Sequence, residues 1–287
     1  QALPRLSAAT TAARYLPAGQ ALEVGGDWYD VIPLSAERVA LVIGDVMGHG
    51  VSEAATMGRL RTALRTLADL ELPPDELMGH LNELVHEFGD DFFATCLFLL
   101  YDPVTRECSI VRAGHPPPAI VSPDGTVRFA AGDSNPPLGA ASPPFDTTRL
   151  WLPEGSLIVL YTDGLVESAT VEVDQGMENL ARTLAAAGRH APPDDDAALQ
   201  ELCDAVTGAL LPVPQATTDD AALLVARVHG LGERDVAAWT LIRSIRGIRR
   251  SRSCSTKALT APGSLCTARA EKTERCRAFW SCCRCRM

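Results

Sequence analysis

Four aspartates stand at the ends of apolar segments, where their carboxylates could act together. Asp45 ends the run RVALVIGD, Asp163 ends SLIVLYTD, Asp27 follows a pair of glycines, and Asp219 comes just before DAALLVARV. A carboxylate at the tip of a buried strand is costly unless cations or hydrogen bonds satisfy it. If the four side chains converge, they form a negative pocket of oxygen ligands, which suits Mg²⁺ or Mn²⁺.

Each aspartate also has a simpler interpretation. An Asp-Gly pair after a strand is usually only a turn, so Asp27 and Asp163 taken singly are weak evidence for a metal site. Asp45 is stronger evidence, because a turn does not require the whole string GDVMGHG at residues 44–50. The choice of Asp219 over Asp220 rests on its position just before the last apolar strand, and a register error of one residue stays open.

The hydrophobic pattern predicts the elements that must position these side chains. Alternating or continuous apolar runs bounded by turn residues predict strands, and leucines at helical spacing predict helices. We expect helices at 51–70, from the Pro73-Pro74 pair to about Phe88, at 176–188 and at 195–210. We expect strands at 10–16, 22–34, 38–45, 92–101, 107–113, 118–122, 126–130, 147–152, 156–162 and 220–228. Strands that flank a central helix pair predict two stacked sheets with helices outside.

The charge of the chain divides at about residue 230. Residues 1–230 carry 13 arginines, no lysine and 32 acidic residues, and residues 231–287 carry 13 basic and 4 acidic residues. The acidic part disfavours nucleic acid as a specific partner. No apolar run reaches the roughly 18–20 residues that span a bilayer, and no signal peptide opens the chain. Only three of the nine cysteines precede residue 231, which favours a reducing, cytoplasmic location.

Several strings together resemble one known family, the PPM-type (protein phosphatase 2C-like) phosphatases, in their bacterial SpoIIE/RsbU-like branch. The three most specific are VGGDWYDV at 24–31, LVIGDVMGHG at 41–50 and LIVLYTDGLVE at 157–167. Four others, in the family's order, are ARYLPA at 13–18, AGHPPP at 113–118, PLG at 137–139 and TDDAALLVAR at 218–227. The resemblance covers roughly residues 10–228.

The resemblance implies an α+β fold, a four-layer αββα sandwich, with two Mn²⁺ or Mg²⁺ ions between the sheets. Asp45 resembles the carboxylate that bridges both ions, and the backbone carbonyl of Val46 would complete one shell. Asp27 resembles the ligand of the second ion, and Asp163 and Asp219 resemble the remaining ligands of the first.

The implied activity is that of a protein serine/threonine phosphatase, which hydrolyses a phosphoprotein with a water activated by the two ions. This fits a chain without the CxxxxxR motif of cysteine phosphatases. His49 could protonate the leaving group, although it could equally cap the helix at 51–70 or pack under the turn. Arg14 is the nearest arginine upstream, where related enzymes bind phosphate.

The resemblance also implies partners. Such phosphatases typically act on a phosphorylated anti-sigma factor antagonist, a small STAS-domain protein, and follow a sensory module such as PAS or GAF. Residues 1–9 resemble the end of a truncated linker from such an upstream sensory domain, which this chain lacks. We expect the helices within 51–88 to lie near the metal-binding loop and to transmit control.

We divide the chain into this linker, a phosphatase domain at 10–230 and a basic tail at 231–287. The tail holds six cysteines and many arginines with almost no apolar periodicity, so we expect it to be disordered or a frameshifted continuation. Its one C-x-x-C lacks a second pair for zinc, and its charge would attract nucleic acid only non-specifically.

Two other functions stay open. A non-catalytic, phosphatase-like sensing or scaffold module is the main alternative, but such a module gains nothing from a repulsive cluster of aspartates. Another two-metal enzyme, such as a nucleotidyl cyclase or nuclease, is disfavoured because residues 1–230 lack lysine and a phosphate-cradling P-loop.

Overall fold

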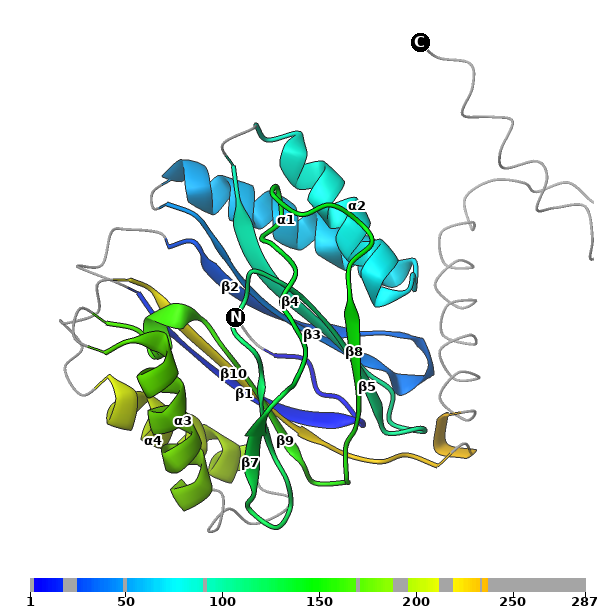
Figure 1. Cartoon of the computed structure of the whole chain (residues 1–287). Helices are drawn as coiled ribbons and strands as arrows, with labels where there is room; N and C mark the ends of the chain where they lie inside the picture. The colour runs from blue at the N-terminus through cyan, green and yellow to red at the C-terminus, as the bar shows by residue number, and fades with distance from the viewer. Residues whose placement is uncertain are drawn as a thin grey trace, which may run out of the picture. The chain divides into compact units, whose positions relative to one another are not determined.

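The computed structural model describes most of the first 236 residues (Figure 1). The described ranges are 3–17, 25–48, 51–89, 92–168, 171–187, 196–211, 219–232 and 234–236. All of them belong to one compact unit, Gln1–Arg243, and residues Ser244–Met287 form a second unit that lies outside the described ranges. The domain boundary predicted at residue 230 therefore stays a prediction, as does the interpretation of the tail.

One antiparallel sheet has the strand order β2-β3-β4-β5-β8. Its strands are β2 (Asp27–Pro33), β3 (Val39–Val46), β4 (Ala94–Tyr101), β5 (Glu107–Ala113) and β8 (Thr147–Trp151). In the β2–β3 pair Asp27 lies directly opposite Asp45, and in the β3–β4 pair Asp45 lies directly opposite Thr95. Side chains directly opposite each other share one face of a sheet, so these three residues face the same way.

The second antiparallel sheet has the order β1-β10-β9-β6-β7. Its strands are β1 (Ala9–Leu16), β10 (Ala221–Val228), β9 (Leu157–Tyr161), β6 (Ala119–Val121) and β7 (Val127–Phe129). The first strand of the chain thus pairs with the last described strand, which closes the fold.

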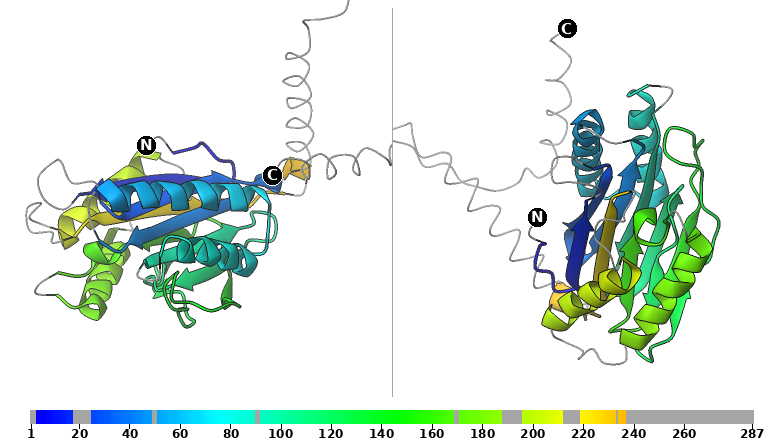
Figure 2. Two further views of the ribbon diagram at one scale, coloured as in Figure 1. Left: turned by 90° about the horizontal axis from the view of Figure 1, so that it is seen from above. Right: turned by 90° about the vertical axis from the view of Figure 1, so that its left-hand side faces the viewer.

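Two helices cover the outer face of each sheet, and both helix pairs can be followed in Figures 1 and 2. Helices α1 (Val51–Asp69) and α2 (Pro74–His86) pack on the first sheet, and α3 (Val173–Ala187) and α4 (Asp196–Leu210) pack on the second. The layers are therefore αββα, which confirms the predicted four-layer sandwich of the α+β class. No described helix is both long and apolar enough to cross a membrane.

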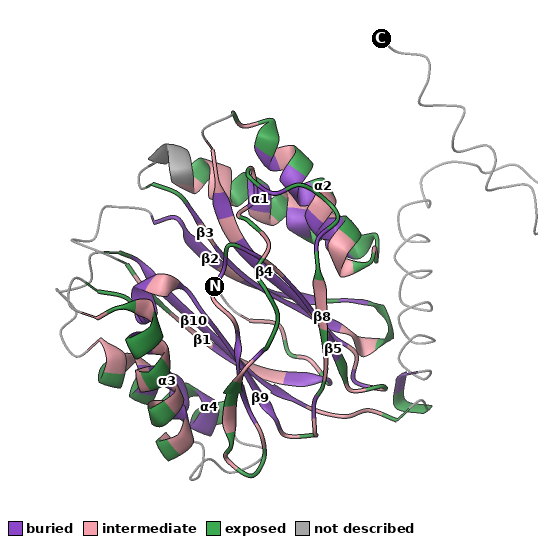
Figure 3. Cartoon of the chain, viewed as in Figure 1, coloured by how far each residue is buried: buried purple, intermediate pink, exposed green. Residues whose placement is uncertain are grey.

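Three apolar clusters hold the layers together, and the buried strands are the purple core of Figure 3. One lies between the sheets around Ile43, Leu99 and Leu224. A second lies under α1 and α2, and a third under α3 and α4. Along central strands such as β3, β4, β9 and β10, alternate residues belong to alternate clusters, as the two-residue period of a strand requires. Both faces of these central strands are thus buried, and polar side chains among them need a specific partner.

The predicted elements agree with the observed ones apart from their ends. Helix α3 begins at Val173, three residues before the predicted start at 176. Gly176 therefore lies inside the helix, although glycine is a poor helix former, and its lack of a side chain lets the helix approach Val166. A Cβ at Gly176 would lie 1.7 Å from the Val166 carbonyl oxygen.

Candidate metal centre

The predicted site residues gather at one end of the sandwich, between the two sheets. Asp27 begins β2 and Asp45 lies one residue before the end of β3. Asp163 follows β9 after one residue, and Asp219 and Asp220 immediately precede β10. Electrostatic interactions connect these carboxylates across the two sheets: Asp27 with Asp45, Asp163 and Asp220, and Asp45 with Asp163, Asp219 and Asp220.

Asp27 is buried and held by a hydroxyl from the opposite sheet. Only 4% of the residue is exposed. Thr162 donates its hydroxyl proton to Asp27 Oδ2 at 2.6 Å, and the Thr162 oxygen accepts the backbone N–H of Ala222 at 2.8 Å. Burial raises the pKa of Asp27 well above its ordinary value; the Thr162 hydrogen bond opposes this rise, and the charges of Asp45 and Asp163 add to it.

Asp45 lies directly opposite Asp27 in the β2–β3 pair. Burial, followed by the charges of Asp163 and Asp219, raises the pKa of Asp45 as well. The two carboxyl groups interact closely enough to titrate as a pair. A cation bound beside them would relieve the repulsion among the carboxylates.

The other two predicted carboxylates lie near enough to Asp45 for their charges to act on it. Asp163 begins a short 3-10 helix, Asp163–Leu165, and its Oδ1 accepts the backbone N–H of Gly164 at 2.9 Å. Burial raises its pKa. Asp219 is exposed, whereas Asp220 is 6% exposed, so both candidates of the ambiguous pair approach the site, and the choice between them stays a prediction.

Two glycines make room for oxygen atoms. A Cβ at Gly26 would lie 2.4 Å from the Val46 carbonyl oxygen, 2.7 Å from Asp45 Oδ1 and 3.3 Å from the Gly48 carbonyl oxygen. A Cβ at Gly25 would lie 1.3 Å from Asp220 Oδ2. Only glycine fits beside these oxygen atoms, and the role predicted for the Val46 carbonyl as a metal ligand stays a prediction.

This donor set fits hard divalent cations, because carboxylate and carbonyl oxygens are the ligands that Mg²⁺ and Mn²⁺ take. Among the described residues, no three His, Cys, Asp or Glu side chains form a group that could hold a metal ion by themselves. The fit therefore depends on pairing the carboxylates with backbone carbonyls such as that of Val46.

The profile of the Stage II sporulation protein E (SpoIIE) family matches residues 35–229, which is more than half of the chain. The chain belongs to the SpoIIE family. Among curated proteins, the phosphoserine phosphatase RsbP of Bacillus subtilis is 29% identical over 151 residues, which cover 50% of this chain and 37% of RsbP. The chain spans less than half the length of the curated relatives that it matches.

Solved structures agree with this assignment. The RsbU and RsbW domains of Rv1364c from Mycobacterium tuberculosis superimpose with a TM-score of 0.72 at 31% identity, covering 79% of this chain and 62% of that one. The catalytic domain of the serine/threonine phosphatase PstP, solved with two manganese ions, shares the fold with a TM-score of 0.57 at 15% identity, covering 77% of this chain and 99% of that one. The SpoIIE family sandwich is thus a PPM-type fold.

Two predicted residues are not among those that the structure brings together. Residues 49–50 lie outside the described ranges, so the role predicted for His49 stays a prediction. Arg14 lies on the outer face of β1, where its guanidinium pairs with Asp204 of α4 at 2.6 Å. Arg14 is therefore held at α4, and the structure does not bring it together with the carboxylates.

Sequence reasoning missed the residues that support the carboxylates. Thr162 sits in the YTDG string directly before Asp163, and strand alternation alone would have turned it toward the space between the sheets. Tyr15, next to Arg14 on β1, is hydrogen-bonded to Asp220 and the backbone of Gly25; burial and the charge of Asp220 raise its pKa. Alternation gives the side of the sheet on which each side chain lies, but the partner that it contacts is on a distant strand and has no local signal in the sequence.

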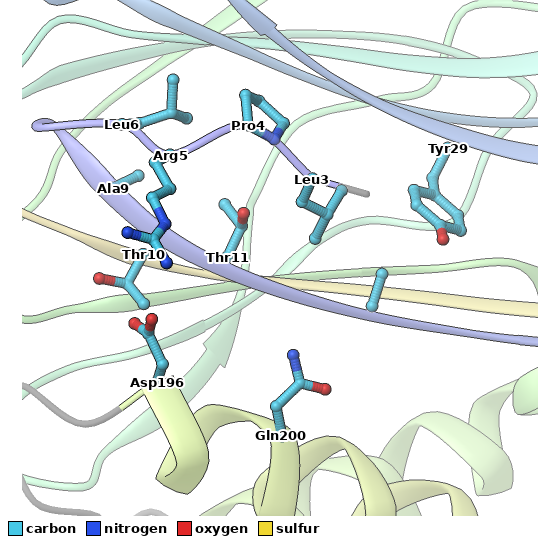
Figure 4. A pocket seen from close by; sticks show the side chains of 11 residues that line it. Leu3, Pro4, Arg5, Leu6, Ala9, Thr10, Thr11, Tyr29, Asp196 and Gln200 are labelled. Atoms are coloured by element: carbon cyan, nitrogen blue, oxygen red, sulfur yellow. The ribbon is translucent and has the colours of Figure 1, made fainter. Parts of the chain in front are cut away.

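A cavity of about 600 Å³ lies elsewhere, beside β1 and the N-terminal residues of α4. In Figure 4 the segment that carries Leu3 and Arg5 runs along one side of it, and Asp196 and Gln200 of α4 form the other. Tyr29 lines it from β2, but none of the predicted site residues does. This cavity is therefore separate from the cluster of aspartates described above.

Proposed function

We propose that the chain is a metal-dependent protein serine/threonine phosphatase. The observation that carries this proposal is the convergence of Asp27, Asp45, Asp163 and the Asp219-Asp220 pair between two sheets, beside the carbonyl oxygen of Val46. The name of RsbP, a phosphoserine phosphatase, supports the same reaction class.

Asp45 would contact both of two divalent ions, Mn²⁺ or Mg²⁺. Asp27 would hold the second ion, Asp163 and Asp219 the first, and the Val46 carbonyl would complete one shell. When bound, such ions acidify water and neutralise the charge of a phosphoryl group. PstP, which holds two manganese ions in the same fold, supports this ion count.

The chain's own residues prepare the ligands. Thr162 orients Asp27 and favours its ionised form through the 2.6 Å hydrogen bond. Binding of cations must release any proton that Asp27 or Asp45 holds, since metal ligands act as carboxylates. His49, four residues after Asp45, is the proposed general acid for the leaving serine or threonine oxygen.

The substrate that we propose is a phosphorylated anti-sigma factor antagonist of the STAS class. The support is the family itself, together with a related structure that carries RsbU and RsbW domains on one chain. An upstream sensory domain would supply control, and the setting would be the cytoplasm. Helix α1 leads directly out of the loop after Asp45 and is the element through which we propose that such control reaches the site.

The test measures phosphate release by the full chain. A phosphoserine STAS protein and p-nitrophenyl phosphate are supplied with Mn²⁺, and then with Mn²⁺ plus EDTA. We expect activity that EDTA abolishes and that Asp45→Asn lowers at least about 100-fold, because loss of outer-shell partners alone costs 10- to 100-fold.

Asp124→Asn is the matched control, since Asp124 is exposed in a turn where asparagine fits equally well. It should leave the rate unchanged. A stable wild-type chain that hydrolyses neither substrate would instead support the non-catalytic scaffold.

A further inference from the structure

His115 is the one histidine among the described residues that is buried, with 3% of it exposed. It lies in the AGHPPP segment after β5, and the proposed mechanism does not use it. Its ring is placed between the sheets: Nδ1 lies 2.9 Å from the Thr95 hydroxyl of β4, and Nε2 lies 3.1 Å from the Tyr161 carbonyl oxygen of β9. One imidazole therefore joins the two sheets directly.

These two contacts fix where the ring proton sits. A carbonyl oxygen can only accept, so Nε2 must carry a proton and donate it to Tyr161. Burial, with a smaller contribution from the nearby Arg112 charge, lowers the pKa of His115 to about 3, so the ring is neutral. Nδ1 is then unprotonated and accepts the hydroxyl proton of Thr95.

Both partners stand beside the proposed ligands. Thr95 lies directly opposite Asp45 in the β3–β4 pair. The Tyr161 carbonyl belongs to the peptide group that ends in the nitrogen of Thr162, whose N–H donates to the Ala222 carbonyl at 3.1 Å. The oxygen and the N–H of the Tyr161–Thr162 peptide group are therefore both hydrogen-bonded. The side chain of Thr162 is the one that donates to Asp27.

We propose that His115 is a positioning residue: its neutral, Nε2-protonated ring sets the spacing and orientation of Asp45 and Asp27 across the two sheets. This inference rests on the proposed function, because the spacing matters for holding cations. The ring also occupies the only proton of the Thr95 hydroxyl, so Thr95 cannot give that proton to Asp45. Asp27 receives a hydroxyl hydrogen bond and Asp45 does not receive this one, which makes the two carboxylates unequal ligands.

The chain contains a matched control. Thr10 of β1 and His229 form another threonine–histidine contact, at 2.9 Å between Thr10 Oγ1 and His229 Nε2. His229 follows β10, whose other end adjoins Asp220, so this second pair lies at the opposite end of that strand from the site. Removing its hydroxyl tests the loss of a threonine–histidine hydrogen bond without disturbing the carboxylates.

The first measurement is the tautomer itself, from two-dimensional spectra of the full chain labelled with ¹⁵N-histidine, with His115 assigned by its loss in His115→Gln. We expect a protonated Nε2 and an unprotonated Nδ1 that stay unchanged between pH 7.5 and 5.5. A ring protonated at Nδ1, or one that titrates in this range, would overturn the proposal.

The second measurement is Mn²⁺ binding by calorimetry, with phosphate release measured in parallel. Thr95→Val keeps the shape of the side chain but removes its donor, and we expect about tenfold weaker Mn²⁺ binding, within the range for an outer-shell partner. Thr95→Ser restores the donor and should return to within about twofold of wild type. Thr10→Val should bind Mn²⁺ as wild type does.

The outcomes separate the two proposals. Wild-type chain that takes up no Mn²⁺ overturns the proposed function and the positioning role together. Mn²⁺ binding that is equal in wild type and a folded Thr95→Val variant overturns the positioning role alone. If Thr95→Val does not fold, His115→Gln decides, because its amide keeps a donor near Tyr161 and should weaken Mn²⁺ binding less than His115→Phe does; equal binding by the two overturns the role.

Discussion

Asp27 and Asp30 lie three residues apart on the same strand, and both are almost fully buried, with 4% and 2% exposed. Their surroundings are opposite. Asp27 faces the space between the sheets, where its charged neighbours are other carboxylates. Asp30 faces α1, where Arg61 approaches Oδ2 at 3.2 Å and Arg65 binds both carboxylate oxygens.

The pKa values of the two groups move in opposite directions. Burial and neighbouring carboxylates raise the pKa of Asp27. Burial acts on Asp30 in the same sense, but the hydrogen bonds from Arg65 and Arg61 outweigh it and hold its pKa below the ordinary value. Burial of an acid is therefore not a mark of a site by itself. A buried acid that is already paired with arginine stabilises the fold, whereas a buried acid surrounded by other acids is a candidate ligand for cations.

The largest expected effect is on the Asp27 side of this comparison. Asp27→Asn removes a proposed ligand and should lower Mn²⁺-dependent phosphate release at least about 100-fold. The same change removes the repulsion between Asp27 and the neighbouring carboxylates, so the thermal midpoint of the metal-free chain should rise. Steady-state kinetics and thermal unfolding with EDTA measure the two effects. A variant that keeps its activity, or loses stability without metal, would contradict the distinction.

The next largest effect is on the Asp30 side. Arg65→Met keeps an apolar stem but leaves the buried Asp30 carboxylate with only Arg61 and the backbone N–H of Val31, which should cost about 3 kcal/mol of unfolding free energy. The Arg65 side chain is 45% exposed. Most of the loss in unfolding free energy therefore comes from the buried Asp30 carboxylate that loses its partner, rather than from the removal of the arginine side chain itself.

Urea unfolding measures this cost. Adding Asp30→Asn to Arg65→Met should recover part of the lost unfolding free energy, because the buried charge is then removed together with its partner. Strict additivity of Arg65→Met and Asp30→Asn would show that the two residues do not act as a pair.

The sequence predicted the strands and the positions of the aspartates at their ends much better than it predicted the residues that contact those aspartates. Apolar runs such as 38–45 and 220–228 located the strands, and the GDVMGHG and TDG strings located Asp45 and Asp163. These signals are local, because each string both ends a strand and carries its own carboxylate.

The supporting residues could not be predicted in the same way. Nothing in the spacing of Arg61 and Arg65 pointed to Asp30, which is 31 and 35 residues away. Likewise, His115 joins β4 to β9 across 20 and 46 residues. Contacts of this kind depend on how the sheets stack, which no local pattern encodes.

A smaller effect should appear in the pH dependence of stability. Since the folded state raises the pKa of Asp27 and Asp45, it binds more protons than the unfolded chain above about pH 4, where free aspartate ionises. Stability of the metal-free chain should therefore fall as pH rises from 5 to 8, with a slope of up to about 1.4 kcal/mol per pH unit for each proton that only the folded state retains.

Asp30 contributes nothing to this trend, because its pKa is lowered and its contribution is lost only on acidification below about pH 4. Urea unfolding at several pH values in EDTA measures the slope. Asp27→Asn should flatten it and Asp30→Asn should not. A slope that Asp27→Asn leaves intact would assign the dependence to other groups.

The smallest expected effect comes from Thr162, which lies on the Asp27 side but acts as Arg65 does for Asp30: it donates to a buried carboxylate. Thr162→Val removes a neutral donor rather than a charge, so it should cost about 1 kcal/mol, roughly a fivefold loss of Mn²⁺ affinity. The hydroxyl favours the ionised form of Asp27, so its loss raises the pKa further and should move the pH at which Mn²⁺ binding sets in upward. Thr162→Ser keeps the donor and should keep the wild-type midpoint. If valine also left that midpoint unchanged, the 2.6 Å hydrogen bond would be a structural contact only, and the repulsion among the carboxylates would alone set the charge of Asp27.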